Sequence, residues 1–524
     1  FHKSSEIKKN LAENKISQMK EAALKEIKDA SIKIAVDSVK KIVITSISSS
    51  VLTFLLSLVV FLSYDKSKGG IQFIDHFQWI DSLNIKSSYL VGVDGFSAPL
   101  VLLTGLLSMV ACMASWRIEK RVKEYFIWIL LLVTSVMGVF TALDLLLFFV
   151  FFEFELIPMY MLISIWGSGR KEYSATKFVI FTLAGGAFML VAILALFSSE
   201  SVTNLSMVSI DELGIIGIPE LIAGQKLIIP ASIIFIFFFI AFAVKLPLWP
   251  FHNWLPDAHT DAPTAVSIML AGVLLKMAGY GLFRINLGFF QETYGFQIFD
   301  YTNFLVILGT ISIIYGAIVT LRQTDLKRLI AYSSISHMGY VLLGFSAITK
   351  NGDFSYYALN GSAMQMFTHG TITGLSFLTV GLIYDRTHTR DINKLGAIAR
   401  KMPMVALFFV ISGLASLGLP GLSGFVSEIM VFLGTYKVYP VETIISAFGV
   451  VLAAGYILWM TQRALFGDNN LDKSDKTYDF NSLKDANSLD LLPAFIITIP
   501  IILIGFFPNL FIEFFDLGIK EIIK

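Results

Sequence analysis

The sequence predicts an all-α polytopic membrane protein with about 13 transmembrane helices, two of which are discontinuous. Of its 524 residues, 55% are hydrophobic and only 15% are charged, a composition typical of membrane proteins. Its apolar runs are about 20 residues long, enough to cross a hydrocarbon core roughly 30 Å thick. The runs are continuous and not alternating, so they indicate helices and exclude a β-barrel.

The expected spans follow one another with short polar connections. They lie at about 42–62, 95–115, 124–143, 144–166, 176–197, 230–250, 263–285, 302–321, 328–348, 357–384, 403–435, 443–462 and 490–508. One alternating set of loops holds nineteen lysines and arginines, Lys473 and Lys476 among them, and the other set holds seven, including Arg284. Because cytoplasmic loops collect these residues, we expect residues 1–41 in the cytoplasm and the C-terminus on the opposite side.

Residues 1–41 differ from the rest of the chain. They are polar and lysine-rich, with apolar residues spaced mostly three to five apart, which predicts an amphipathic helix. Such a helix either lies on a membrane surface or pairs with another helix. The run AENKISQMKEAALKEIKDASIKIAVDSVKK resembles the C-terminal part of the peripheral-stalk b subunit of ATP synthase. The chain begins with Phe1 and not with Met, which suggests that it is clipped or incomplete. Residues 1–41 are either native or the product of a fusion or an assembly artefact.

Charged side chains interrupt the apolar runs at Glu153, Lys245, Lys276 and Glu428. A charge at the middle of a membrane helix costs roughly 2.5 to 3.5 kcal/mol on insertion scales, so such residues usually face an interior polar path. Histidines in neighbouring apolar runs add groups that titrate near neutral pH. Carboxylate, lysine and histidine at membrane depth are the usual parts of a proton relay, and the candidates of this kind are His369 and, as an accessory with Lys327, His337.

Two of the apolar runs are broken beside these charges. Pro247 and Pro250 follow Lys245, and the GLPG sequence at 418–421 precedes Glu428. Discontinuous helices at matching places in two halves indicate an inverted-repeat transporter with its ion site near the midplane. A lysine that gains or loses a carboxylate partner can hold or release a proton. We therefore expect Glu153 to pair with Lys245.

In this scheme Lys276 and His369 are the next proton carriers, and Glu428 is the exit. Structural interpretations compete with it, since intramembrane lysines and glutamates also form purely structural pairs or reach toward the interface. Glu155 is expected to point to another face and to act as a local partner, and His337 to serve packing. The remaining polar residues near the first break are expected at the surface, as histidines, or at helix caps, as aspartates: His252, His259, Asp257 and Asp261.

Several function classes are excluded or disfavoured. A formal net charge of +1 gives no reason to expect a nucleic-acid partner, and the single cysteine, Cys112, cannot form an intrachain disulfide. The sequence has no phosphate-binding glycine motif and no spacing typical of metal ligands. We therefore expect no cofactor and no metal in this chain.

Six segments resemble one known family. They are VDGFSAPLVLLTGLL, FELIPMYMLI, AFAVKLPLWPFHNWLPDAHTDAPTAVSIMLAGVLLKMAGYGL, TDLKRLIAYSSISHMGYVLLG, THGTITGLSFLTVG and LPGLSGFVSE. They are similar to the proton-translocating antiporter-like subunits of NADH:quinone oxidoreductase, respiratory complex I. The SISHMG motif and the end of the chain soon after the last span are more typical of the M type than of the L type.

The resemblance covers about residues 42–515 and implies two inverted five-helix repeats, at about 124–285 and 302–462. It implies a translocase subunit without a redox centre, in which Glu153, Lys245, Lys276, His369 and Glu428 relay protons. NADH and ubiquinone would bind other subunits, and the partners would be other membrane-arm subunits and the lipid bilayer of a bacterial inner membrane. Two alternatives stay open: a subunit of a multi-subunit sodium/proton antiporter, and a non-pumping assembly protein.

Overall fold

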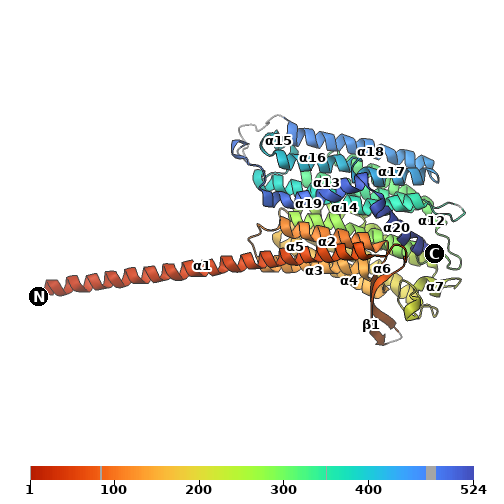
Figure 1. The fold of residues 1–524 in the computed structure, drawn as a ribbon, viewed down its shortest axis with the longest axis horizontal. Coiled ribbons are helices and arrows are strands. Elements are labelled where there is room, and N and C mark those ends of the chain that lie inside the picture. The colour runs from red at the N-terminus through yellow and green to blue at the C-terminus, as the bar shows by residue number, and fades with distance from the viewer. Residues whose placement is uncertain (1, 83–84, 350, 468–479, 524) are drawn as a thin grey trace.

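A computed structural model of the chain describes residues 2–82, 85–349, 351–467 and 480–523. Lys473 and Lys476 lie outside the described residues. Within them, ten helices are long and apolar enough to cross a membrane, and two shorter apolar helices end at the predicted breaks. The helices lie side by side in one bundle, with the two chain ends at opposite ends of the molecule (Figure 1). The all-helical class is confirmed, whereas the count of 13 spans and the inverted repeats stay predictions.

Nearly every predicted span coincides with one helix or a pair of short helices. The longer helices are α1 (His2–Ser63), α2 (Ser97–Ala114), α3 (Val122–Thr141), α6 (Lys171–Phe197), α12 (Phe299–Thr320), α13 (Leu326–Phe345), α14 (Tyr356–Thr387), α18 (Pro440–Thr461) and α19 (Ser488–Phe506). The shorter ones are α4 (Leu145–Phe154), α5 (Leu156–Trp166), α7 (Ile218–Ile222), α8 (Ala231–Lys245), α9 (Trp254–Asp261), α10 (Thr264–Met269), α11 (Leu275–Gly281), α15 (Ile398–Lys401), α16 (Pro403–Ser416), α17 (Ser423–Tyr436) and α20 (Asn509–Ile523).

Helix α1 joins the N-terminal segment and the first predicted span without interruption. Its described side chains from Ser4 to Lys41 are exposed, and this part projects beyond the bundle (Figure 1). Farther along, α1 packs closely on α2, because a Cβ atom at Gly105 would lie 2.2 Å from the hydroxyl oxygen of Ser57. The placement of residues 1–41 on a membrane surface or against another helix stays a prediction.

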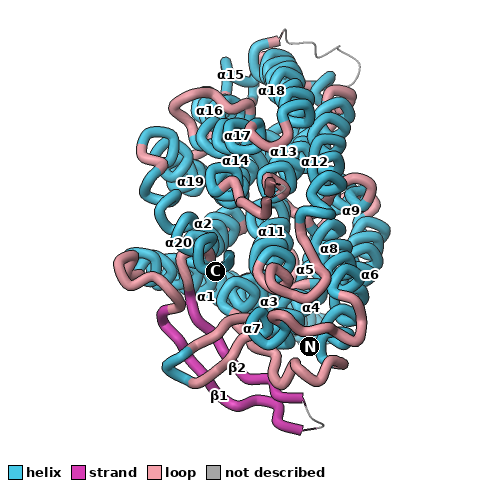
Figure 2. Tube along the Cα trace, turned by 90° about the vertical axis from the view of Figure 1, so that its right-hand side faces the viewer, coloured by secondary structure: helices cyan, strands magenta, loops and turns pink. Residues whose placement is uncertain are grey.

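A two-stranded antiparallel sheet, formed by β1 (Gln72–Ser82) and β2 (Ile85–Val93), follows α1. It extends from one end of the bundle near α7 (Figure 2). The amphipathic helix α20 closes the same end, where Phe514 stacks on Phe61 with ring centroids 4.3 Å apart. Long apolar runs predict membrane spans only, so neither the hairpin nor this 15-residue helix was expected.

Two helical segments form the centre of the bundle. The stretch Thr264–Leu287, which contains α11, and helix α14 are each fully buried over their most apolar window. These segments carry Lys276 and His369. Protein therefore surrounds the two residues on all sides, as expected of charges that face an interior path.

Candidate functional site

The first broken helix keeps its backbone polar groups satisfied within the protein. Helix α8 ends at Lys245, and α9 begins at Trp254. The Trp254 indole donates to the carbonyl oxygen of Val244 at 2.9 Å, and the Leu248 amide donates to that of Ala243 at 3.0 Å. Because lipid offers no such partners, a break of this kind requires a protein environment. The α9 segment therefore continues inside the bundle and does not leave it at Pro247.

The Lys245 ammonium is held by a buried carboxylate. Its Nζ lies 2.7 Å from Oε1 of Glu155, and both side chains are almost completely buried. Nζ also donates to the Phe152 carbonyl oxygen at 2.9 Å and lies 3.7 Å from the centroid of the Phe152 ring. The charge is thus compensated by one carboxylate, one carbonyl and one aromatic face.

The expected pairing of Lys245 with Glu153 is wrong. The Glu153 carboxylate lies instead against α6, where a Cβ atom at Gly186 would approach its Oε1 to 2.1 Å. Its Oε2 is buried without a hydrogen-bond partner among the described residues. Helices α4 and α5 meet at Glu155, and this junction directs Glu155 toward α8 while Glu153, still within α4, faces α6.

Lys276 lies at the centre of the bundle beside a π-helical turn, Leu270–Leu274. Such turns free backbone carbonyls and are frequent at functional sites. Here the Lys276 ammonium donates to the carbonyl oxygen of Ala271. It also lies 2.8 Å from Nδ1 of His369, whose Nε2 has no partner within the described residues. The first contact of the expected relay, from Lys276 to His369, is therefore within hydrogen-bonding distance.

His337 continues this row of polar groups. Its ring centroid is 5.6 Å from that of His369, and its Nε2 is 3.7 Å from Oε1 of Glu428. Both ring nitrogens face backbone carbonyl oxygens, those of Ser333 at 2.7 Å and Ser416 at 3.0 Å. A neutral imidazole can donate to one of them and an imidazolium to both. His337 therefore lies in this row, between His369 and Glu428.

The second break positions the end of this row. Helix α16 ends at Ser416 and α17 begins at Ser423, with Gly418 and Gly421 at φ values of 75° and 91° between them. Such conformations favour glycine. A Cβ atom at Gly418 would also lie 2.6 Å from Oε2 of Glu428. The glycine thus serves the turn and leaves room for the carboxylate.

The structure corrects the expectations for the residues after the first break. His252 and His259 are buried, not at the surface. His252 lies 3.2 Å from the Tyr315 hydroxyl, and His259 stacks on Phe377 of α14 with centroids 4.6 Å apart. The physical reason is that α9 folds back into the bundle. His252 lies in the short 3-10 turn Phe251–Asn253 that precedes α9, and His259 lies within α9.

The neighbouring aspartates are not helix caps. Asp257 pairs with Lys177 at 2.7 Å and with Arg328 at 3.6 Å. Asp261 accepts a hydrogen bond from the Ser174 hydroxyl at 2.6 Å. Lys327, the second accessory candidate, donates to the carbonyl oxygen of Ala262 at 2.7 Å, beside α9 and away from Glu428.

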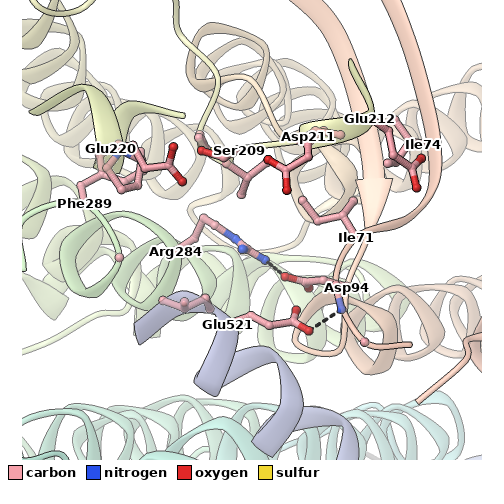
Figure 3. A pocket seen from close by; sticks show the side chains of 18 of the residues that line it. Ile71, Ile74, Asp94, Ser209, Asp211, Glu212, Glu220, Arg284, Phe289 and Glu521 are labelled. Atoms are coloured by element: carbon pink, nitrogen blue, oxygen red, sulfur yellow. Dashed lines mark hydrogen bonds and ion pairs between the residues drawn. The ribbon is translucent and has the colours of Figure 1, made fainter. Parts of the chain in front are cut away.

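A pocket of about 540 Å³ lies at the end of the bundle that carries the β-hairpin. Figure 3 shows the ion pair between Arg284 and Asp94 at its wall, with Glu521 hydrogen-bonded to the Gly70 amide nearby. Arg284 was expected in a loop, but it is buried in the π-helical turn Leu282–Leu287. The pocket is separate from the contacts of Lys245 and of Glu428.

The fold and the site define a class of protein: a multi-pass helical membrane protein with two broken helices, each beside a buried charge of opposite sign. Comparison with known sequences agrees. Residues 142–454 match the family described as "NADH:quinone oxidoreductase/Mrp antiporter, TM".

Its relatives include subunit M of the NADH-quinone oxidoreductase of Rhodobacter capsulatus, which is 42% identical over 79% of this chain and 78% of that protein. A chain 4 of the NAD(P)H-quinone oxidoreductase of Synechococcus elongatus is 41% identical over 86% of this chain and 81% of its own length. The chain therefore belongs to the NADH:quinone oxidoreductase/Mrp antiporter family, within the subunit M group.

Solved structures share the fold. A chain of respiratory complex I from Thermus thermophilus matches with a TM-score of 0.76 at 28% identity, covering 91% of this chain and 95% of that one. A chain of the Mrp complex from Dietzia matches with a TM-score of 0.75 at 18% identity, covering 94% of this chain and 97% of that one. The second likeness concerns the fold alone.

Proposed function

We propose that this chain is a membrane-arm subunit that translocates protons across a bacterial inner membrane, driven by quinone reduction in other subunits of an NADH:quinone oxidoreductase. The observation that carries the proposal is the row of buried titratable groups from Lys276 through His369 and His337 to Glu428. Nζ of Lys276 lies 2.8 Å from Nδ1 of His369, and Nε2 of His337 lies 3.7 Å from Oε1 of Glu428. Rows of this composition at membrane depth are typical of proton relays.

In this mechanism Lys245 sets the charge state of the row. While the ammonium of Lys245 is held by a carboxylate, its field on the rest of the bundle is weak; while it moves away from that carboxylate, its positive charge acts through a low-dielectric interior. The second state favours loss of the proton from Lys276 to Nδ1 of His369. His337 then accepts the proton and passes it to Glu428, beside the second break.

The chain contributes proton movement and no electron transfer in this proposal. NADH and ubiquinone would bind to other subunits, and cofactors are not expected in this chain. Its direct partners would be other membrane-arm subunits and lipid. Residues 1–41 would lie on the cytoplasmic side.

A second candidate is a subunit of a multi-subunit sodium/proton antiporter, favoured by the likeness in fold to the Dietzia Mrp complex. The higher identity to subunit M relatives favours the first proposal. Uptake assays in inverted vesicles, with and without sodium and with a protonophore, separate the two. Acidification that depends on NADH and is independent of sodium supports the first, whereas sodium-dependent exchange without NADH supports the second.

Replacement of the central lysine tests the relay. In membranes that contain the assembled complex, Lys276→Met should abolish NADH-driven proton uptake and slow quinone reduction, because the row loses its first carrier. The matched control is Lys226→Met, which removes an exposed lysine and should leave both rates unchanged. A non-pumping assembly protein would instead tolerate Lys276→Met, Lys245→Ala and Glu153→Ala without loss of proton uptake.

A further inference from the structure

The lysine at the first break contacts one carboxylate, and a second carboxylate lies nearby on the same short segment. Lys245 is paired with Glu155 at 2.7 Å. Glu153 lies against Gly186 of α6, and Val244, the residue before Lys245, lies against the adjacent Gly185. The Oε2 of Glu153 lacks a hydrogen-bond partner among the described residues. The first carboxylate is therefore occupied by the lysine, and the second is available to it.

The contacts that hold the Lys245 ammonium come from one short segment of the chain. Lys245 is the last residue of α8 before the break, and Glu155 lies at the junction between α4 and α5. Of the contacts that hold the ammonium, those to Phe152 and to Glu155 all come from this one junction. The Lys245 side chain therefore meets one short segment of the chain, Phe152 to Glu155, and this segment also carries Glu153.

The ion pair with Glu155 is strong enough to fix the Lys245 side chain in one conformation. The Glu155 side chain is fully buried, and its carboxylate has no hydrogen-bond partner other than Lys245 within the described residues. A buried charge left without its partner is strongly unfavourable, whereas removal of both partners of a buried pair is often tolerated. Separation of the pair therefore raises the free energy, and re-formation of the original contact lowers it again.

We propose that Glu155 is the resting partner of Lys245 and that each pumping cycle exchanges this contact for one with Glu153. The inference rests on the proposed function and adds a positioning residue to it. Glu155 does not carry the transported proton. It holds the ammonium away from Glu153 and draws it back when the cycle ends.

The first experiment uses the assembled complex in native membranes with Glu155→Gln, Glu155→Asp and, as a control, Glu172→Gln at an exposed position of α6. The amount of complex and the protons taken up per NADH oxidised are measured. Glu155→Gln should lose coupled proton uptake even when corrected for the amount of complex. Glu155→Asp should restore part of it, because a carboxylate remains; a purely structural role would change the amount of complex and not the ratio. Native uptake per NADH in Glu155→Gln would overturn the proposal.

A second experiment decides the matter if Glu155→Gln fails to assemble. Glu155→Leu alone should reduce the complex severalfold, and combining it with Lys245→Met should restore assembly toward the level of Lys245→Met alone, because no charge is left unpaired. The same double replacement with Glu153→Leu should show no such recovery. If the Glu155 double variant assembles no better than Glu155→Leu, the pairing is overturned. Failure of the proposed function looks different: Lys245→Met would then pump at the native ratio, whatever the assembly data show.

Discussion

The two broken helices differ in how they hold their charge. At the first break, Lys245 is in direct contact with a carboxylate at 2.7 Å and a carbonyl oxygen at 2.9 Å. At the second, Glu428 approaches its nearest basic group, His337, only to 3.7 Å. A tight buried pair favours one state and resists change, while a loose contact lets a proton enter or leave. In the proposed mechanism the first break therefore acts as the switch and the second as the site of proton transfer.

The largest effect is expected from breaking the tight pair. Lys245→Ala leaves Glu155 as an uncompensated buried charge, which typically costs about 3 to 5 kcal/mol. Thermal unfolding of the purified complex should therefore begin at lower temperature, and proton uptake should be lost. Lys226→Ala is the control at an exposed site. A native unfolding temperature of Lys245→Ala would show that the Lys245–Glu155 pair does not stabilise the fold.

Replacement of the loose contact should slow transfer and spare stability. His337→Gln keeps a polar side chain but removes the titratable ring between His369 and Glu428. Loss of a positioned proton carrier typically costs on the order of 100-fold or more in rate. NADH-driven uptake by inverted vesicles should fall accordingly while the melting temperature stays near the native value. A lower melting temperature with native proton uptake would instead show that His337 serves packing.

A smaller effect is expected from crowding the second break. Gly418→Ala introduces a Cβ atom 2.6 Å from the Glu428 carboxylate at a residue with φ of 75°. The backbone strain alone is about 1 to 2 kcal/mol. Gly352→Ala separates the two causes, because Gly352 has a φ of 84° and open space around it. Both variants should lose similar stability, but only Gly418→Ala should pump fewer protons; equal uptake would show that Glu428 does not need this space.

The smallest effect is expected at the surface. Lys66 pairs with Glu513 at 2.7 Å, but both side chains are substantially exposed. Exposed pairs contribute about 0 to 1 kcal/mol. Lys66→Met should therefore change neither the melting temperature of the complex by a measurable amount nor proton uptake. A loss of thermal stability as large as that of Lys245→Ala would show that the buried pair contributes no more to stability than the exposed pair.

The sequence predicted the helical class, both breaks and the charged residues that are buried beside them, because apolar length and charge within an apolar run are local properties. It could not predict which carboxylate reaches Lys245. Glu153 and Glu155 are two residues apart, and the choice depends on the junction between α4 and α5. Contacts between helices have no signature in the order of residues along one helix.

The same limit explains the histidines. His252, His259 and His337 stand near polar or charged loop sequence, which suggested surface or packing roles. Their burial follows from the return of α9 into the bundle and from the packing of α13 beside the second break, where the Ser416 carbonyl meets His337 at 3.0 Å. These are consequences of tertiary structure.

The most direct test of the account is the number of protons taken up per NADH oxidised by complexes that carry Glu428→Gln. The account predicts a lower ratio than in the native complex, with normal assembly, because the relay row loses its terminal proton carrier. Glu172→Gln should keep the native ratio. A native ratio in Glu428→Gln would contradict the claim that protons cross this subunit through the row from Lys276 to Glu428.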